Sequence, residues 1–215
     1  LFFSCRKESF ISSPDARLSL SADSIKFDTV FTTVGSITQS FKIFNDNDQK
    51  LLLSKVKLMG GAGSAYKINI NGLAVIEADN IELAANDSIY IFVTVNVNPS
   101  AANLPFIISD SILINYNGNN RFVQLQSYGQ NAHFLDNTMI ATNTVWPNDL
   151  PYVILGGIQI DTAISLTINA GCRIYSHANA PFIVDGTLII NGTKGNEVQF
   201  ASDRLEKKKK NFPGG

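Results

Sequence analysis

The sequence carries almost no net charge. It has 17 Lys and Arg against 18 Asp and Glu, which gives a formal charge of −1, and charged residues make up only 16% of the chain. Proteins that bind nucleic acids usually have a basic excess, so this balance argues against a nucleic-acid partner. It also excludes a polyelectrolyte tail and a membrane attachment driven by charge.

Long hydrophobic runs are missing as well. No run of apolar residues approaches the length of about 18 that a membrane-spanning helix needs. Hydrophobic residues nevertheless make up 45% of the 215 residues, which is ordinary for a folded protein. The chain is therefore long enough to build one large domain or two small ones around a hydrophobic core.

Residues that carry catalysis or bind metals are scarce. The sequence has 2 cysteines, Cys5 and Cys172, which are too few for a disulfide framework. Its 2 histidines, His133 and His177, lie far from any nucleophile motif of the G-x-S-x-G type. Closely spaced zinc ligands and phosphate-binding glycine motifs are also missing. We therefore expect no catalytic residue, no metal and no cofactor, although either histidine remains open as a ligand or base as well as an ordinary loop residue.

Short segments with a period of two fill residues 16–135. The clearest is Ser88–Asn98, in which Ile89 and every second residue after it are aliphatic. This alternation predicts strands that bury one face. The same pattern recurs at residues 41–44, 56–58, 66–70, 112–116 and 123–126. Turn residues separate the segments, and Asn117-Gly118 predicts a tight hairpin between the last two strands. Seven or eight such strands, without a helix of useful length, predict a β-sandwich.

This region resembles the Ig-like modules of the abnormal-spindle and Hydin type. The matching residues are Phe27-Asp28, Gly35, Phe41-Lys42-Ile43-Phe44-Asn45, Leu51-Leu52, Tyr66-Lys67-Ile68, Val93 to Pro99 and Tyr128-Gly129. The resemblance implies an Ig-like sandwich that acts as a spacer or a binding surface. It implies little about chemistry, because such modules carry many functions.

A second, self-similar pattern follows Pro151. The segment Leu166–Gly171 aligns with Leu188–Thr193, twenty-two residues later, and Arg173–Ser176 then aligns with Val198–Ala201. Short β-branched strands repeating at this spacing predict a solenoid. Residues 166–175 and 181–188 resemble the first turns of right-handed parallel β-helix proteins. We therefore expect an all-β chain in which residues 136–215 hold a joint and the first turns of such a helix.

The aromatic and acidic residues of the second region leave alternatives open. Trp146 is expected to pack at the joint, with a sugar-stacking platform as the alternative. Asp161 and Asp185 lie about one turn apart, which is a weak indication of calcium, whereas Arg173 and Glu197 are separate charges. A glycoside hydrolase needs two carboxylates across the scissile bond, and the sequence does not indicate such a pair.

The first five residues resemble the end of a bacterial lipoprotein signal. An apolar stretch and a small residue precede Cys5, although Phe2 stands where that family usually has Leu. The resemblance implies that Cys5 is acylated and that residues 1–15 tether the protein to outer-membrane lipid. The alternative is a buried or disulfide-bonded cysteine. Near the other end, Lys207–Lys210 predicts a solvated loop, and we expect the sequence to be part of a longer protein.

Asp followed by Ser or Thr and then a small or aliphatic residue occurs five times. The pattern resembles the O-glycosylation acceptor of exported Bacteroidota-type proteins. The implied acceptors are Ser24, Thr29, Ser88, Ser111 and Thr162. The alternative is that each Asp caps a turn before a strand.

Taken together, the sequence resembles Bacteroidota-type right-handed parallel β-helix repeat lipoproteins with an N-terminal Ig-like module. This resemblance implies a non-catalytic, outer-membrane-anchored protein of the bacterial cell envelope, facing either the periplasm or the cell surface. In it the Ig-like module caps a β-helix, and the β-helix presents a binding or adhesion surface for glycans or surface partners. One alternative is a polysaccharide lyase or glycoside hydrolase whose catalytic turns lie beyond Gly215. Another is a purely structural adhesive stalk.

Overall fold

The computed structural model describes residues 9–32, 34–98 and 106–203. They form two compact units: residues 9–27, 34–98 and 107–128 make up the first, and residues 28–32, 106 and 129–203 the second. Both consist of strands, and the one helical element in these ranges is a short 3-10 turn, η1 (Gly61–Gly63). No helix in the described ranges is long and apolar enough to cross a membrane. The expected all-β fold class is thus confirmed.

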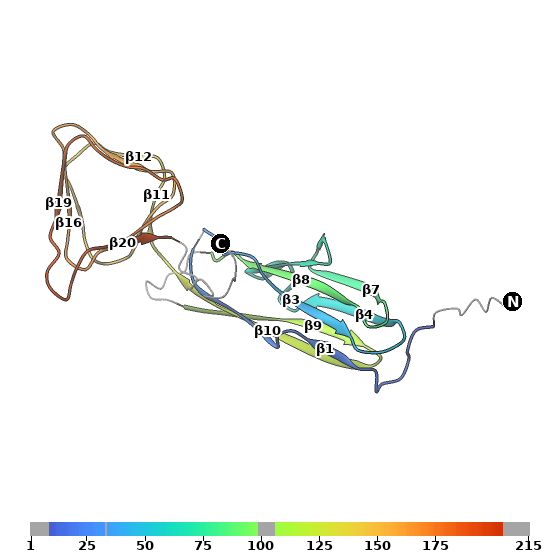
Figure 1. Cartoon of the computed structure of the whole chain (residues 1–215). Helices are drawn as coiled ribbons and strands as arrows, with labels where there is room; N and C mark the ends of the chain where they lie inside the picture. The colour runs from blue at the N-terminus through green and yellow to red at the C-terminus, as the bar shows by residue number, and fades with distance from the viewer. Residues whose placement is uncertain (1–8, 33, 99–105, 204–215) are drawn as a thin grey trace, which may run out of the picture. The chain divides into compact units, whose positions relative to one another are not determined.

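Two five-stranded sheets form the sandwich of the first unit (Figure 1). Sheet A has the order β1-β3-β8-β5-β6, and sheet B has the order β2-β10-β9-β4-β7. The strands of sheet A are β1 (Leu18–Leu20), β3 (Gln39–Asn45), β8 (Ser88–Val95), β5 (Tyr66–Ile70) and β6 (Leu73–Ala74). Those of sheet B are β2 (Ser24–Phe31), β10 (Asn119–Gln130), β9 (Phe106–Tyr116), β4 (Leu51–Leu58) and β7 (Glu77–Leu83).

Alternation along the strands builds the core of this unit, as the sequence predicts. In β8 the aliphatic side chains from Ile89 to Val95 are buried, while Tyr90 and Phe92 point to solvent. The same rule buries Phe41 and Ile43 of β3. Burial of one strand face is what holds each sheet in register.

The first unit has more strands than the seven or eight expected. β1 and β6 are only three and two residues long, too short to show a period. β7 carries Glu77, Asp79 and Glu82, and Leu83 is its only fully buried residue. It lies at the edge of sheet B, where solvent exposure removes the need for alternating apolar residues.

The predicted Asn-Gly hairpin has the expected geometry, and a second Asn-Gly turn shares it. Asn117 and Gly118 join β9 to β10 with φ of 43° and 80°, and Asn71 and Gly72 join β5 to β6 with φ of 49° and 97°. Two consecutive positive φ angles characterise the type I′ hairpin, which Asn and Gly adopt with little strain.

Three parallel sheets form a β-solenoid of about three turns in the second unit (Figure 1). Their orders are β11-β14-β17-β20, β12-β15-β18 and β13-β16-β19. The first turn contains β11 (His133–Leu135), β12 (Thr138–Ile140) and β13 (Thr144–Trp146). The second contains β14 (Tyr152–Ile154), β15 (Ile158–Ile160) and β16 (Ser165–Ile168), and the third contains β17 (Arg173–Ser176), β18 (Phe182–Val184) and β19 (Thr187–Ile190). β20 (Gln199–Ser202) continues the first of these sheets.

The residue pairing that the repeat predicts between turns is correct in one sheet and shifted by one residue in another. Leu166 lies opposite Leu188, as expected. Arg173, however, lies opposite Gln199 and not Val198. The observed pairing places Phe200 over the buried Ile174, whereas the predicted alignment would place Gln199 there. A shift of one residue reverses the faces of a strand, so the observed register sets Phe200 opposite Ile174, although Phe200 itself is 50% exposed.

The solenoid also begins earlier than the pattern after Pro151 indicates. β11, β12 and β13 pair with the strands of the second turn, so the first turn starts at His133. Trp146 was expected at the joint, but it is 5% exposed and belongs to the solenoid core together with Tyr152 and Ile168. Its indole stacks on the ring of Tyr152 at 4.2 Å between centres, with the planes 9° apart. This burial corrects the placement of Trp146 and excludes it as an open sugar platform.

Candidate functional site

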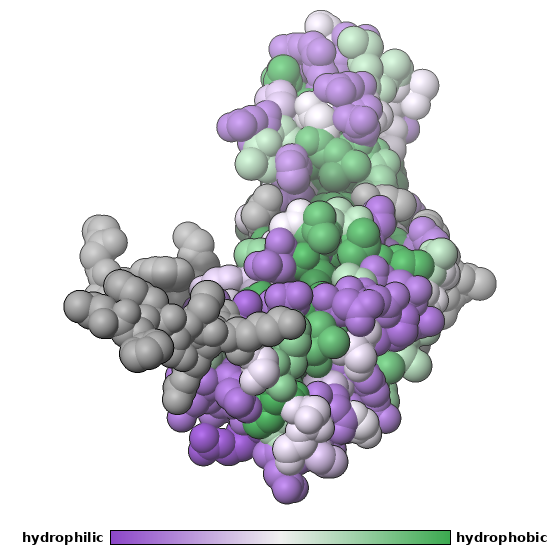
Figure 2. All heavy atoms as spheres, turned by 90° about the vertical axis from the view of Figure 1, so that its right-hand side faces the viewer, coloured by the Kyte–Doolittle hydropathy of each residue, from purple (hydrophilic) through white to green (hydrophobic). Residues whose placement is uncertain are grey.

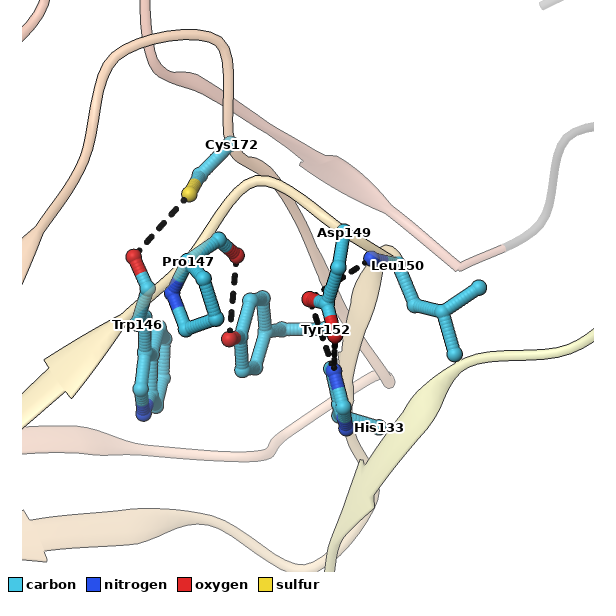
Figure 3. A network of polar contacts seen from close by, with 7 residues as sticks. All are labelled: His133, Trp146, Pro147, Asp149, Leu150, Tyr152 and Cys172. Carbon is cyan, nitrogen blue, oxygen red and sulfur yellow. Dashed lines mark hydrogen bonds and ion pairs between the residues drawn. The ribbon is translucent and has the colours of Figure 1, made fainter. Parts of the chain in front are cut away.

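His133 of β11 belongs to a network of polar contacts in the second unit (Figure 3). Its Nε2 atom lies 3.0 Å and 3.1 Å from the carboxylate oxygens of Asp149. Its ring stacks on Tyr152, whose hydroxyl donates a 3.1 Å hydrogen bond to the carbonyl of Pro147. The Cys172 thiol lies 3.4 Å from the carbonyl oxygen of Trp146, as a weak donor.

The electrostatics of this network indicate a structural role. The hydrogen bond from His133 lowers the pKa of the Asp149 carboxyl. Burial raises the pKa of both the Tyr152 hydroxyl and the Cys172 thiol, so both stay protonated at neutral pH. A nucleophile needs a deprotonated, accessible atom, and Cys172 is fully buried. The geometry therefore favours a packing cluster over an active site.

His177 forms a second pair with a carboxylate. Its Nδ1 atom lies 2.6 Å from Oδ2 of Asp203, whose side chain is 1% exposed. Oδ1 of Asp203 has no hydrogen-bond partner among the described atoms. Within residues 9–32, 34–98 and 106–203, no three His, Cys, Asp or Glu side chains gather as metal ligands would.

The acidic residues of the solenoid have separate hydrogen-bond partners. Asp161 and Asp185 follow paired residues of neighbouring turns. The carboxylate of Asp161 accepts the backbone N–H of Thr162, and that of Asp185 accepts the amide of Gln159. Glu197 accepts the N–H of Gly195. Each carboxylate therefore has a local partner, and the arrangement offers no shared calcium cage.

The five hydroxyls implied as glycan acceptors are spread over both units. Ser24 and Thr162 are exposed, whereas Thr29, Ser88 and Ser111 are partly buried. The carboxylates of Asp87, Asp110 and Asp161 each accept the backbone N–H of the next residue at 2.7 Å. These three contacts have the form of the turn-capping alternative, while modification itself stays a prediction. Cys5 and Lys207–Lys210 lie outside the described residues.

A row of three side chains crosses the outer face of sheet A. Nζ of Lys42 lies 4.5 Å from the ring centre of Tyr90 and 5.9 Å from that of Phe44. The rings of Tyr90 and Phe92 stack at 5.6 Å, with 15° between their planes. Both rings are about 40% exposed, at 42% and 39%. The cation–π contact and the ring stacking together stabilise the orientation of these side chains on the sheet.

A hollow of about 500 Å³ lies beside Phe92 at the end of this row. Phe92 forms an aromatic wall, and Thr38, Lys67, Asn69 and Thr94 add polar groups. Register explains the gathering, because Asn69 of β5 lies opposite Phe92 of β8, and Lys67 lies opposite Thr94. The side-chain Oδ1 atom of Asn69 accepts the backbone N–H of Gly72 at 2.7 Å, which fixes the side chain at the rim.

The hollow beside Phe92 is the candidate functional site. A smaller hollow, of about 210 Å³, lies on the solenoid between Met139 and Ile183 and has no charged lining residue. Hydrophobic side chains also reach the surface in several patches among hydrophilic ones, on the face that Figure 2 shows. Of these two hollows in the described residues, the one beside Phe92 joins an exposed aromatic ring to several polar groups, which is typical of a binding site.

The sequence contains a signal for this site. The alternation pattern identifies the buried face of the strand, whereas the signal lies on its solvent face. In Ser88–Asn98 the residues between the buried aliphatics are Tyr90, Phe92, Thr94 and Asn96, so two neighbouring aromatic rings fall on the solvent face of the strand. The contribution of Lys67 and Asn69 has no sequence signal, because it depends on the pairing of β5 with β8.

The comparisons with known proteins leave the family open. The sequence matches no protein-family profile and no curated protein. Solved structures that share part of its fold include a family 123 glycoside hydrolase from Clostridium perfringens, with 9% identity, a TM-score of 0.39 and coverage of 62% of this chain and 31% of the hydrolase. The chain thus spans about a third of the length of that enzyme.

Two further structures are similarly distant. A Porphyromonas gingivalis protein of unknown function has 8% identity and a TM-score of 0.37, with coverage of 59% of this chain and 60% of that protein. The ASH or PapD-like domain 7 of human CEP192 has 9% identity and a TM-score of 0.34, with coverage of 57% of this chain and 94% of that domain. These values are too low to carry an argument about activity.

Proposed function

We propose that this protein is a non-catalytic lipoprotein of the bacterial cell envelope that binds glycans through the hollow beside Phe92. In this proposal Cys5 carries the acyl anchor and the sandwich binds the glycan. Acyl anchoring, export and the Ig-like family of the sandwich rest on the sequence resemblances alone.

One observation carries the glycan proposal, namely the row of Lys42, Tyr90 and Phe92 that ends at a hollow lined by both apolar and polar side chains. Sugars present C–H groups that pack on aromatic rings and hydroxyls that need hydrogen-bond partners. Phe92 supplies the ring, and Thr38, Asn69 and Thr94 supply the partners. A hollow of about 500 Å³ is within the usual range for small ligands.

The test is glycan binding by the full chain, measured on an array of neutral and acidic glycans and then by calorimetry on the best ligand. We expect Phe92→Ala to weaken binding by on the order of tenfold or more, because a stacked aromatic wall is lost. Phe122→Ala is the matched control, since Phe122 is 45% exposed on β10 of sheet B. Equal binding by wild type and the Phe92 variant would contradict the proposed site.

A further inference from the structure

We infer that the hollow beside Phe92 selects acidic sugars, with the carboxylate of the sugar paired to Lys67. This inference rests on the proposed glycan-binding function and narrows it to one chemical class. It starts from the charges on the two sheets of the sandwich.

The strands of sheet A contain Lys42 and Lys67 but no Asp or Glu. In sheet B, two lysines of β4 lie beside acids of β7: Nζ of Lys55 is 2.6 Å from Asp79, and Nζ of Lys57 is 3.2 Å from Glu77. Lys55 and Lys57 are thus neutralised by acids of their own sheet, whereas the strands of sheet A offer no acid to Lys42 or Lys67.

The two lysines of sheet A have different surroundings. The ammonium group of Lys42 is held over the rings of Tyr90 and Phe44. Lys67 is exposed, lines the hollow and has no ion-pair partner among the described residues. Lys67 is therefore the cation that remains available to a ligand on this face.

The nearest acid along β8 lies at the wrong end of the strand. Asp87 precedes Ser88, and its carboxylate accepts the Ser88 N–H. Thr94, which lines the hollow, is seven residues further on, roughly 20 Å along an extended strand. The carboxylate of Asp87 is thus too distant to neutralise Lys67 directly.

These features define the ligand. A carboxylate on the sugar ring would pair with the Lys67 ammonium, while the C–H face of the ring packs on Phe92. The side-chain oxygen of Asn69 accepts the N–H of Gly72. The NH₂ group of the same side chain has no partner among the described residues. That amide can donate to a ring hydroxyl or to the same carboxylate. A neutral sugar would pack on the Phe92 ring and accept from the Asn69 amide, but it would leave the Lys67 ammonium unpaired.

The experiment compares matched probes on the full chain by calorimetry. Oligomers of glucuronic, galacturonic and mannuronic acid are each measured beside their methyl esters, which keep the ring and remove the charge. We expect at least one acid to bind several-fold tighter than its ester, with Lys67→Gln abolishing that preference and leaving ester binding nearly unchanged. Lys26→Gln, on an exposed site of β2 in sheet B, is the matched control and should keep the preference.

The outcomes separate the two proposals. Equal binding of acids and esters, or an acid preference that survives Lys67→Gln, would overturn the selection of acidic sugars while leaving glycan binding in place. Loss of the preference in the Lys26 variant as well would also overturn it, because a general charge effect would then explain the data. Absence of binding to any glycan would overturn the proposed function itself.

Discussion

Two buried asparagines show how residues that predict a turn can also stabilise it. Asn45 is 1% exposed, and its NH₂ group donates to the carbonyls of Gln49 and Ala84 at 2.8 Å and 2.7 Å. Asn47 is also buried, and its side chain accepts from the N–H of Arg17 and donates to the carbonyl of the same residue. Buried polar groups of this kind stabilise a fold only when they are fully hydrogen-bonded.

At the same scale, the pair between His133 and Asp149 predicts a dependence of stability on pH. The folded pKa of Asp149 lies below its ordinary value of 3.8, so its contribution is complete above that value and is lost as the pH falls through the lower, folded pKa. We expect Asp149→Asn to lower the melting temperature slightly at pH 6 and to have less effect near pH 2.5. The effect is small, because the pair is exposed.

Thermal unfolding between pH 6 and pH 2.5, followed by fluorescence, measures this dependence. His133→Gln removes the same contact and should give a curve like that of Asp149→Asn. A gap between wild type and the Asp149 variant that stays constant over the whole range would contradict the assignment.

At the scale of elements, the apolar side chains of the third turn of the solenoid are more exposed to solvent than those of the second. Ile168 of β16 is fully buried, while its neighbour in register, Ile190 of β19, is 48% exposed. The same contrast separates Ile174 from Phe200. Inward side chains contribute to stability when a turn packs on both sides of them.

Ile168→Ala and Ile190→Ala form a matched pair that tests this contrast. We expect Ile168→Ala to destabilise the second unit by about 2–5 kcal/mol, since it opens a cavity in a closed core. Ile190→Ala should have an effect of no more than about 1 kcal/mol, because little apolar area is removed from packing. Urea unfolding measures both, and similar losses for the two variants would show that Ile190 is covered in solution.

At the scale of the whole molecule, the two units have separate cores. The sequence has a single tryptophan, Trp146, and it lies in the core of the second unit. Its fluorescence therefore reports the solenoid, whereas far-UV circular dichroism reports both units.

This separation predicts that the two signals respond differently to core mutations. Leu53 is fully buried in sheet B, so Leu53→Ala should shift the circular-dichroism transition in urea more than the fluorescence transition. Ile168→Ala should shift the fluorescence transition most. If both variants moved both transitions together, the two units would unfold as one cooperative body.

The sequence by itself determined the all-β class, most strands of the sandwich, the Asn-Gly hairpins and the repeat that marks the solenoid. These features are local, because side-chain alternation and positive φ angles act within a few residues of one another. β7 shows the limit of this reasoning, since an edge strand need not alternate.

Only the tertiary structure decided the register of β20, the start of the solenoid at His133, the burial of Trp146 and the hollow beside Phe92. Each depends on contacts between residues distant in the chain. Phe200 lies opposite Ile174 because β20 pairs with β17 in that register. Lys67 and Asn69 meet Phe92 because β5 pairs with β8. Pairing of whole strands, through burial and backbone hydrogen bonds together, is the physical cause of these features.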